Sequence, residues 1–343
     1  MTPTNDPTAD TGYKKDNGKK VIYLDTNFIS AIAKVHLGQI KDERFSAIYE
    51  TLTALSEEGR IVVPESNFHH IELAGASEII KTKALEVLKS LSMEVGVKDW
   101  RDILDLQMGR AVEGFFGGAS VPPSRQEALC KTPKRLSTDI FFDLSETSRE
   151  KELFMLYGKR QKALFEKFLG KSWKLLPQET LKFFKTGREG ERRVLVCDYF
   201  KQPCRRGHFS NCIVNAYRIN RDSSKIVMAR YREFDPGFRR FKEFTDSNEL
   251  KGAPFIDIIS SLIAAIFAYE RARSPRMGDF YDVLIVGTVL PYCDALATDN
   301  FMKSLLVTRL GLDKKCGVEV FSKKNDEIDR FLHYLDRITS QGC

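Results

Sequence analysis

Acidic side chains at two distant places in the chain stand directly after short runs of strand-forming residues. Asp25 follows the run VIYL, and Asp299 follows the run DALAT near the other end of the sequence. Ligands of a parallel sheet gather beyond the carboxyl ends of its strands, so an acid in this position is placed where chemistry usually occurs. Glu72 and Asp282 are expected on helices that can reach the same edge. We therefore expect Asp25, Glu72, Asp282 and Asp299 to converge.

Such a group of carboxylates would need a cation. Four negative side chains in one pocket repel one another and partly take up protons unless a positive charge neutralises them. A ligand set made only of oxygen suits Mg²⁺ or Mn²⁺, which bind through a few carboxylates and keep several waters. An ion of this kind lowers the pKa of a bound water and orients that water towards a phosphodiester. Phosphodiester hydrolysis is the reaction that fits.

Smaller polar groups and two further acids surround these positions. Thr26 and Asn27 directly follow Asp25, where they could cap the next helix or hold the Asp25 carboxylate in place. Asp294 and Asp279 are candidates for a supporting acid. The alternative for Asp25 is a purely structural role, because an aspartate between a strand and a helix is also a good helix N-cap.

Two adjacent histidines compete with the carboxylates as ligands. Glu65, His69 and His70 lie on the expected helix that also carries Glu72. Adjacent side chains on a helix point about 100° apart, so the two imidazoles do not easily share one metal. We interpret the pair as one packed and one solvated residue, with a ligand role as the less favoured alternative.

A second set of possible ligands lies in the middle of the chain. Cys197, Cys204, His208 and Cys212 bring the right atoms for zinc within sixteen residues. Structural zinc ligands usually come in pairs separated by about two to four residues, whereas six residues separate the first two cysteines here. Reduced, partly buried cysteines are the favoured interpretation, and a zinc site stays open.

Strands and helices alternate at both ends of the sequence. Apolar runs bounded by turn residues predict strands, and apolar residues at helical spacing predict helices. The expected strands cover residues 21–24, 60–63, 294–298 and 317–321, and the expected helices begin near residues 26, 42, 65, 255, 282 and 325, with a break near Gly75. This alternation predicts an α/β protein whose parallel sheet is assembled from residues 20–96 and 254–340.

Residues 97–253 are expected to be an insertion in this sheet, basic and mainly helical. A helix is expected over 145–169, whereas 194–200 and 212–231 could be strands or helices. Residues 151–250 hold 23 Lys and Arg against 12 Asp and Glu, and 16 of the 37 aromatic residues. A basic surface with aromatic side chains suits a polyanion with exposed bases. The same aromatic residues could instead form the core of the insertion.

Composition limits the class of protein. A chain of 343 residues can form one enlarged domain or two, and the polar residues 1–19 are expected to be a disordered tail and not a signal peptide. No apolar run is long enough to span a membrane. Seven scattered cysteines without an export signal indicate reduced thiols in a cytoplasmic protein.

Three segments of the chain together resemble the PIN domain, a compact α/β nuclease fold. They are VIYLDTNFIS, VVPESNFHHIEL and GDFYDVLIVGTVLPYCDALATDN, which lie near the two ends of the sequence. The ending LPYCDALATD is similar to that of large bacterial PIN-like proteins. By this likeness the metal acids would be Asp25, Glu72, Asp282 and Asp299, joined by Asp294, with Thr26, Asn27 and Thr298 as supporting polar groups.

The resemblance implies a PIN-like, Rossmann-like core of three layers and cleavage of RNA by an endoribonuclease that depends on Mg²⁺ or Mn²⁺. The expected partner is nucleic acid, RNA more than DNA, with an inhibitor protein or a second copy of the chain as further partners. Two alternatives stay open. One is an inactive module that binds nucleic acid or protein, and the other is a DNA-directed nuclease of a defence system. The presence of all four acids favours catalysis.

Overall fold

The computed structural model describes residues 18–118, 123–131, 177–196, 211–269 and 277–340. These residues belong to two compact units. Unit 1 contains residues 1–97, 122–132 and 289–343, and unit 2 contains residues 98–121 and 133–288. Each unit is described by itself below.

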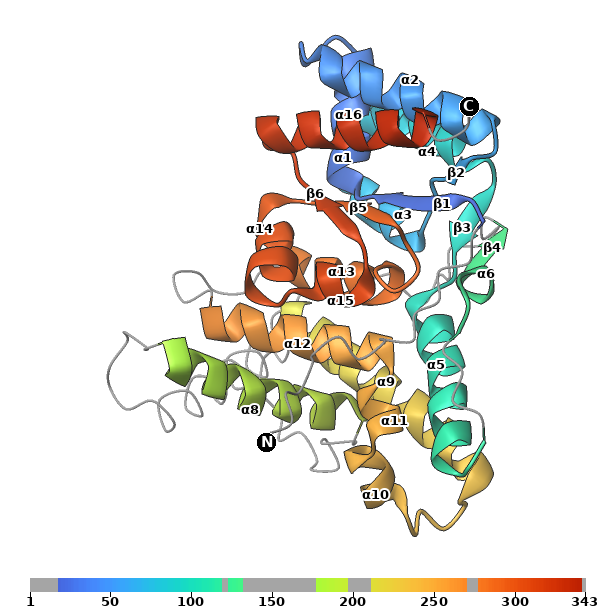
Figure 1. Cartoon of the computed structure of the whole chain (residues 1–343), viewed down its shortest axis with the longest axis vertical. Coiled ribbons are helices and arrows are strands. Elements are labelled where there is room, and N and C mark those ends of the chain that lie inside the picture. Colours follow the sequence, from blue (N-terminus) through green and yellow to red (C-terminus); the bar gives the residue numbers. More distant parts are fainter. Residues whose placement is uncertain (1–17, 119–122, 132–176, 197–210, 270–276, 341–343) are drawn as a thin grey trace, which may run out of the picture. The chain divides into compact units, whose positions relative to one another are not determined.

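Unit 1 is built on a parallel sheet of four strands in the order β2-β1-β5-β6 (Figure 1). The strands are β1 (Lys20–Leu24), β2 (Ile61–Val62), β5 (Ala295–Ala297) and β6 (Glu319–Phe321). The first part of the chain runs from β1 outward to β2, and the last part runs from β5 outward to β6. The strand order therefore reverses between β1 and β5, and α/β proteins usually bind ligands beyond the strand ends at such a reversal.

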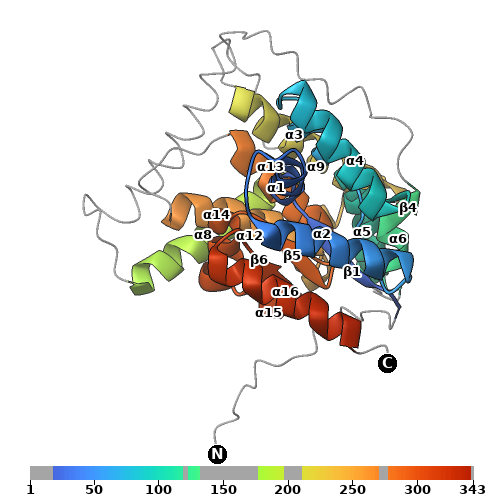
Figure 2. The same ribbon diagram turned by 90° about the horizontal axis from the view of Figure 1, so that it is seen from above.

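Successive residues of a strand point to opposite faces of the sheet, and these short strands carry apolar residues on both faces. Helices therefore cover both faces of the sheet. On one face, Ile22 and Leu24 of β1 join Phe321 of β6 in the main core cluster of this unit. The helices that contribute to this cluster are α1 (Thr26–His36), α2 (Glu43–Glu57), α4 (Glu78–Ser92) and α16 (Asn325–Ser340). Figure 2 shows α2 and α16 side by side above the strands. In Figure 1, α14 (Asn300–Lys303), η2 (Ser304–Arg309) and α15 (Leu312–Cys316) lie on the opposite side of the sheet.

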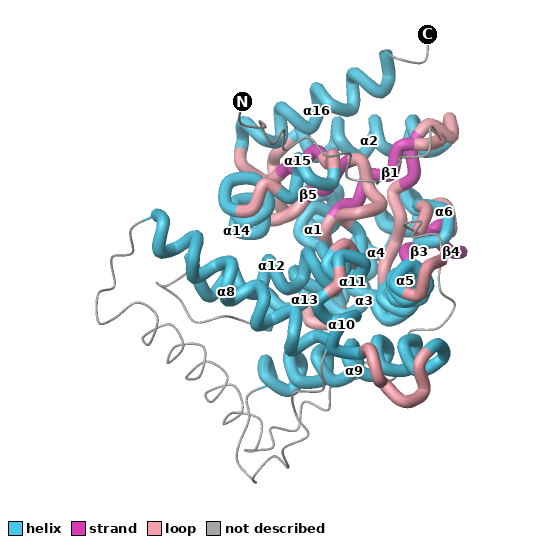
Figure 3. Tube along the Cα trace, turned by 60° about the horizontal axis from the view of Figure 1, so that its bottom comes forward, coloured by secondary structure: helices cyan, strands magenta, loops and turns pink. Residues whose placement is uncertain are grey.

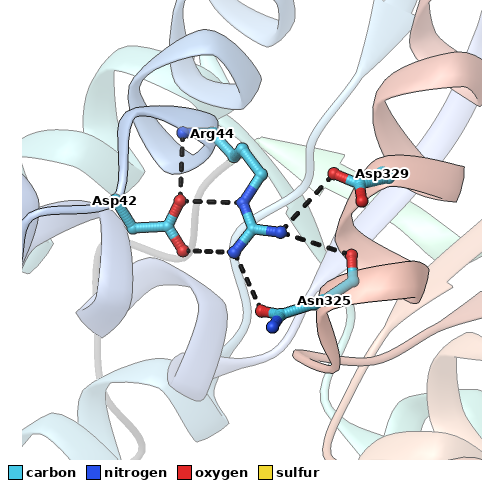
Figure 4. Close-up of polar contacts among 4 residues, drawn as sticks. All are labelled: Asp42, Arg44, Asn325 and Asp329. Carbon is cyan, nitrogen blue, oxygen red and sulfur yellow. Dashed lines mark hydrogen bonds and ion pairs between the residues drawn. The ribbon is translucent and has the colours of Figure 1, made fainter.

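A polar clamp joins the start of α2 to the start of α16 (Figure 4). The guanidinium of Arg44 donates to both carboxylate oxygens of Asp42, at 2.9 and 2.8 Å. It also donates to the side-chain oxygen of Asn325 at 2.9 Å, and it lies 3.5 Å from a carboxylate oxygen of Asp329. Two parallel hydrogen bonds between Arg and a carboxylate fix the geometry of both groups. The clamp therefore fixes the first turn of α2 relative to the first turn of α16.

Most elements that were expected at the two ends of the chain are present. The break near Gly75 separates α3 (Asn67–Leu73) from α4, and the helix expected to begin near residue 282 is α13 (Met277–Val289). A small antiparallel pair, β3 (Val95–Val97) and β4 (Leu129–Lys131), was not expected. The fold is mixed α/β with a parallel sheet, as the alternation of elements predicted.

Unit 2 is helical throughout the part that the structure describes (Figure 3). Its helices include α5 (Trp100–Phe115), α8 (Pro177–Val196), α9 (Asn211–Phe234), α10 (Phe241–Asp246), α11 (Asn248–Lys251) and α12 (Pro254–Tyr269). Helix α12 packs against α8 and α5. Residues 254–288 therefore group with unit 2, although the sequence placed 254 at the return to the sheet.

Helix α9 decides between two alternatives that the sequence left open. Residues 212–231 could be strands or helices, and the structure shows one unbroken helix through them. The buried residues Ser224, Val227 and Tyr231 follow one another at intervals of three and four, which is the period of a helix and not of a strand. Described aromatic residues of this region, including Tyr231 and Phe244, are buried against one another. The alternative in which aromatic residues form the core of the insertion thus holds for these side chains.

Several expectations concern residues outside the described ranges. The helix over 145–169 and the residues 197, 204 and 208 of the possible zinc set are among them, as is most of the N-terminal tail. Within the described residues, the helices are too short or too polar to cross a membrane.

Candidate functional site

Asp25 lies at the carboxyl end of β1, beside the neighbouring strand β5. Its backbone N–H donates to the carbonyl of Ala297 at 2.9 Å. Its side chain caps α1, because the N–H of Asn27 donates to Oδ1. The hydroxyl of Thr298 donates to Oδ2 at 3.2 Å, and the amide of Asn27 reaches the same oxygen at 3.5 Å. With an exposed fraction of only 4%, Asp25 is a buried carboxylate held on both oxygens.

Asp299 occupies the equivalent position after β5. Thr298 extends the strand, since its N–H donates to the carbonyl of Phe321 at 3.0 Å. Asp299 then caps α14, with the N–H of Met302 donating to Oδ1 at 2.7 Å. Asp25 and Asp299 thus stand at the ends of the two strands between which the strand order reverses.

Glu72 approaches these aspartates from the last turn of α3. It faces Thr26, the first residue of α1. The hydroxyl of Thr26 is buried, and within the described ranges no group lies at hydrogen-bond geometry to it. The hydroxyl is nevertheless close enough to the Glu72 carboxylate to favour its charged form. Glu72 therefore lies close enough to Thr26, Asp25 and Asp299 to interact with them electrostatically, and its role as a metal ligand stays a prediction.

Burial and mutual repulsion raise the pKa of two of these acids. Burial is the main cause for Asp25, and the charge of Asp299 adds to it, so that its pKa is raised to about 6 despite opposing hydrogen bonds from Asn27 and Thr298. Burial likewise raises the pKa of Glu72 to about 7, with further contributions from the charges of Asp25 and Asp299. The charges of Asp25, Glu72 and Asp299 consequently act on one another, and no positive charge is among the main causes of the two pKa shifts.

The oxygen atoms of these residues suit a hard cation such as Mg²⁺, but the residues are not grouped as a complete set of ligands. The side chains around the three acids, including Thr26, Asn27 and Thr298, offer hydroxyl and amide oxygens beside the carboxylates, and oxygen ligands are those that Mg²⁺ and Mn²⁺ prefer. A cation would also relieve the repulsion that raises the two pKa values. However, within the described ranges no three His, Cys, Asp or Glu side chains are grouped as a formed metal site. Asp25 and Asp299 each use an oxygen to cap a helix instead.

Asp282 and Asp279 belong to unit 2. Both lie on α13, where Asp279 is buried in the first turn and Asp282 is half-buried one turn later. Residues three apart share a face of a helix, so the two acids project in similar directions. Their participation in the site stays a prediction from the sequence.

Asp294 is not among the acids that the structure brings together. It directly precedes β5, so it lies at the amino end of the sheet, opposite Asp25 and Asp299. There it accepts from the N–H of Val21 at 2.9 Å and pairs with Arg125 at 2.9 Å. The expectation that Asp294 supports the same site is corrected by this position, because its partners show a structural role at the start of β1.

The ion pair of Asp294 gives a stability prediction. Both Asp294 and Arg125 are buried, and Asp294→Ala would leave the guanidinium of Arg125 without its carboxylate. Loss of one partner of a buried pair typically costs about 3 kcal/mol or more, which urea denaturation would measure. Asp294→Asn combined with Arg125→Met should cost less, since no buried charge is stranded. A single Asp294→Ala variant as stable as the wild type would contradict the structural role.

His69 fixes the end of the strand that leads to Asp25. Its Nδ1 accepts from the N–H of Ser66 at 3.1 Å, so Nε2 carries the hydrogen and donates to the carbonyl of Leu24 at 2.7 Å. The ring stacks on Tyr23 with 5.1 Å between centroids, and the Tyr23 hydroxyl is 2.7 Å from Ser66 Oγ. Burial lowers the pKa of His69 to about 4, which keeps the imidazole neutral.

The two adjacent histidines have different surroundings, as the sequence suggested. His69 is packed, with 1% of its surface exposed, whereas His70 is partly exposed and pairs with the carboxylate of Glu65. His69 and Glu72 are three residues apart and share one face of α3. Helix α3 therefore places two side chains near the same end of β1, the neutral imidazole of His69, which binds the Leu24 carbonyl, and the carboxylate of Glu72.

Removal of the two His69 hydrogen bonds should destabilise unit 1. His69→Phe keeps an aromatic ring against Tyr23 but leaves the Leu24 carbonyl and the Ser66 N–H unpaired, each at a cost of about 1 to 3 kcal/mol. We expect His69→Gln, which retains an amide donor and acceptor, to lose less stability in urea denaturation. His333→Gln is the control, because His333 is exposed on α16. Equal stabilities of His69→Phe and the wild type would exclude the tethering role.

Comparison with known proteins adds no further identification. No family model, curated protein or solved structure matches the chain.

Proposed function

We propose that this protein is a nuclease of the PIN-like kind that hydrolyses phosphodiester bonds in RNA with the help of Mg²⁺ or Mn²⁺. One observation carries the proposal. Asp25, Glu72 and Asp299 gather at the strand-order reversal, and two of them have raised pKa values. Carboxylates that are removed from solvent and repel one another reduce stability, so their presence in one place favours a functional role.

The proposed roles follow from the contacts of each side chain. Asp25, Asp299 and Glu72 would hold the cation, and a role for Asp282 stays a prediction from the sequence. Asn27 and Thr298 fix the two oxygens of Asp25, so its orientation is set before any ligand arrives. When bound, the cation would supply a water of lowered pKa and stabilise negative charge on the leaving oxygen.

A second candidate function has a specific observation in its favour. Asp25 and Asp299 already serve as helix caps, and the described residues contain no formed group of three metal ligands. A binding protein that uses the same fold without catalysis is consistent with both facts. The two candidates make different predictions about divalent cations.

Incubation with labelled substrates separates these functions. Single-stranded RNA and DNA of one sequence would be incubated with the protein in Mn²⁺ or in EDTA. Shortened RNA in the Mn²⁺ lanes alone supports the ribonuclease. Cleavage restricted to DNA would support a DNA-directed enzyme, and intact substrate together with retained binding would support the binding protein.

A further inference from the structure

A pair of stacked aromatic rings, one of them exposed, marks one surface of unit 2. Phe234, at the end of α9, is 46% exposed. Its ring lies almost parallel to that of Phe116, with 5.6 Å between centroids and 10° between planes. Ile40, Ile79, Met93 and Leu181 are the other large apolar side chains exposed in the described ranges, and all four are aliphatic. Phe234 thus differs from them in offering an aromatic face to solvent.

A rigid aromatic core supports this pair from behind. Phe116 contacts Phe115 and Tyr231, with centroids 5.1 and 5.6 Å away. Tyr231 is buried, and its hydroxyl donates to Asp235 at 3.1 Å. The same carboxylate accepts the N–H of Arg240 at 2.9 Å, which fixes the loop between α9 and α10. Because the supporting rings are packed, little conformational freedom would be lost when a ligand stacks on Phe234.

One cationic side chain lies over the rings that support Phe234, and a second, Arg232, lies 5.4 Å from the ring of Phe238. The guanidinium of Arg240 lies 4.7 Å from the ring of Phe115 and 5.7 Å from that of Phe116. Arg232, Arg239 and Lys242 are exposed, and none of them has an ion pair to another described residue. The nearby acid Glu243 pairs with Arg240 at 2.8 Å. We call Phe116, Phe234, Arg232, Arg239, Arg240 and Lys242 the Phe234 platform.

We infer that the Phe234 platform binds an unpaired RNA strand, with a base stacked on Phe234 and phosphates near Arg232, Arg239 and Lys242. An exposed aromatic ring with exposed cations in the same segment of the chain is a combination by which proteins hold single strands without reading sequence. A protein helix would need a groove of several apolar side chains in place of one ring. The choice of RNA rests on the proposed function, whereas the binding itself requires no catalysis.

Binding of a fluorescent single-stranded RNA oligonucleotide, measured by anisotropy in EDTA, tests this inference. Phe234→Ala is expected to weaken binding about 10-fold, the usual effect of losing one stacked base. Phe234→Trp should bind as tightly as the wild type or more tightly. Leu181→Ala is the matched control, because Leu181 is an exposed apolar residue of α8 with no part in the platform. Thermal denaturation would verify that each variant folds.

A second variant tests the cations and does not depend on the aromatic change. Each phosphate contact to a single strand contributes about 0.7 to the slope of log affinity against log salt concentration. Combined Arg239→Ala and Lys242→Ala should therefore lower the magnitude of that slope by about 1.4. Duplex RNA should be insensitive to Phe234→Ala, since its base faces are already stacked.

The outcomes distinguish the platform from the nuclease. Weaker RNA binding by Phe234→Ala would support the platform even if the wild type cleaves nothing. Unchanged affinity and salt slope in folded variants would overturn the inference even if the wild type cleaves RNA. Equal losses for duplex and single strand would also overturn it, because stacking on an exposed ring requires an unpaired base.

Discussion

Asp25→Asn is expected to lower the rate of Mn²⁺-dependent RNA cleavage by at least about 100-fold while making the metal-free protein more stable at pH 8. The change removes a negative charge and almost no volume. Asn27 can still donate to the remaining oxygen, and the hydroxyl of Thr298 can accept from the new amide as readily as it donates to the carboxylate. Under the proposed function, the substitution therefore removes a cation ligand and little else.

The gain in stability follows from the raised pKa of Asp25. At pH 8 the buried carboxylate is ionised beside Asp299 and Glu72, at a cost that the neutral amide avoids. A pKa shift of one unit corresponds to about 1.4 kcal/mol, so we expect a gain of about 1 to 3 kcal/mol in the free energy of unfolding. Chemical denaturation in EDTA measures this difference without any reference to activity.

Asp42→Asn is the matched control. Asp42 also caps a helix, and its side chain accepts the N–H of Arg44 at 3.2 Å. The hydrogen bond from the Arg44 side chain lowers the pKa of Asp42, which is the opposite direction from Asp25. Asp42→Asn should therefore reduce stability by about 1 kcal/mol or less and leave cleavage unchanged. A stability loss in both variants would show that Asp25 is a structural cap and not a cation ligand.

The metal-free protein is expected to lose about 5 kcal/mol of stability as the pH rises from about 4 to about 7. Asp25 and Glu72 have raised pKa values of about 6 and about 7 in the folded chain, against ordinary values of 3.8 and 4.5. Between these values the folded state keeps protons that the unfolded state has already released. Stability from these groups is therefore full below about pH 4 and is lost as the pH passes the folded pKa values.

Other ionisable groups also contribute, so the measured quantity is a difference. The double variant Asp25→Asn with Glu72→Gln lacks both titrations, and its pH profile would be subtracted from that of the wild type. Mn²⁺ should restore part of the lost stability of the wild type at pH 8, about 2.7 kcal/mol at a hundredfold excess over Kd. The double variant should gain little. Equal Mn²⁺ effects on both proteins would place the binding site elsewhere.

The position of Asp25 and Asp299 could be predicted because local signals determined it. A β-rich run followed directly by an acid and a helical pattern specifies a strand, a cap and a helix without knowledge of tertiary contacts. The parallel pairing of β1 with β5 then brings the two acids together. The approach of Glu72 could be predicted because the helix that follows β2 carries it.

Other features depend on contacts that sequence spacing does not encode. Asp294 and Asp299 flank the same short strand and so lie at opposite ends of the sheet, but the sequence did not reveal that Asp294 pairs with Arg125 and accepts from the N–H of Val21. The tether from His69 to the Leu24 carbonyl arises from a side chain reaching across to a backbone group 45 residues away. Helix α12 is apolar on most of its surface and could pack in either unit. Its sequence therefore did not predict that it belongs to unit 2.

Anomalous diffraction from crystals soaked in Mn²⁺ tests most directly whether acids from the two ends of the chain share one cation. We predict a manganese peak with both Asp25 and Asp299 among its ligands, at the edge of the sheet where β1 and β5 end, and no peak there in Asp25→Asn crystals. Absence of a peak at that edge in the wild type, at manganese concentrations that support RNA cleavage, would contradict the account.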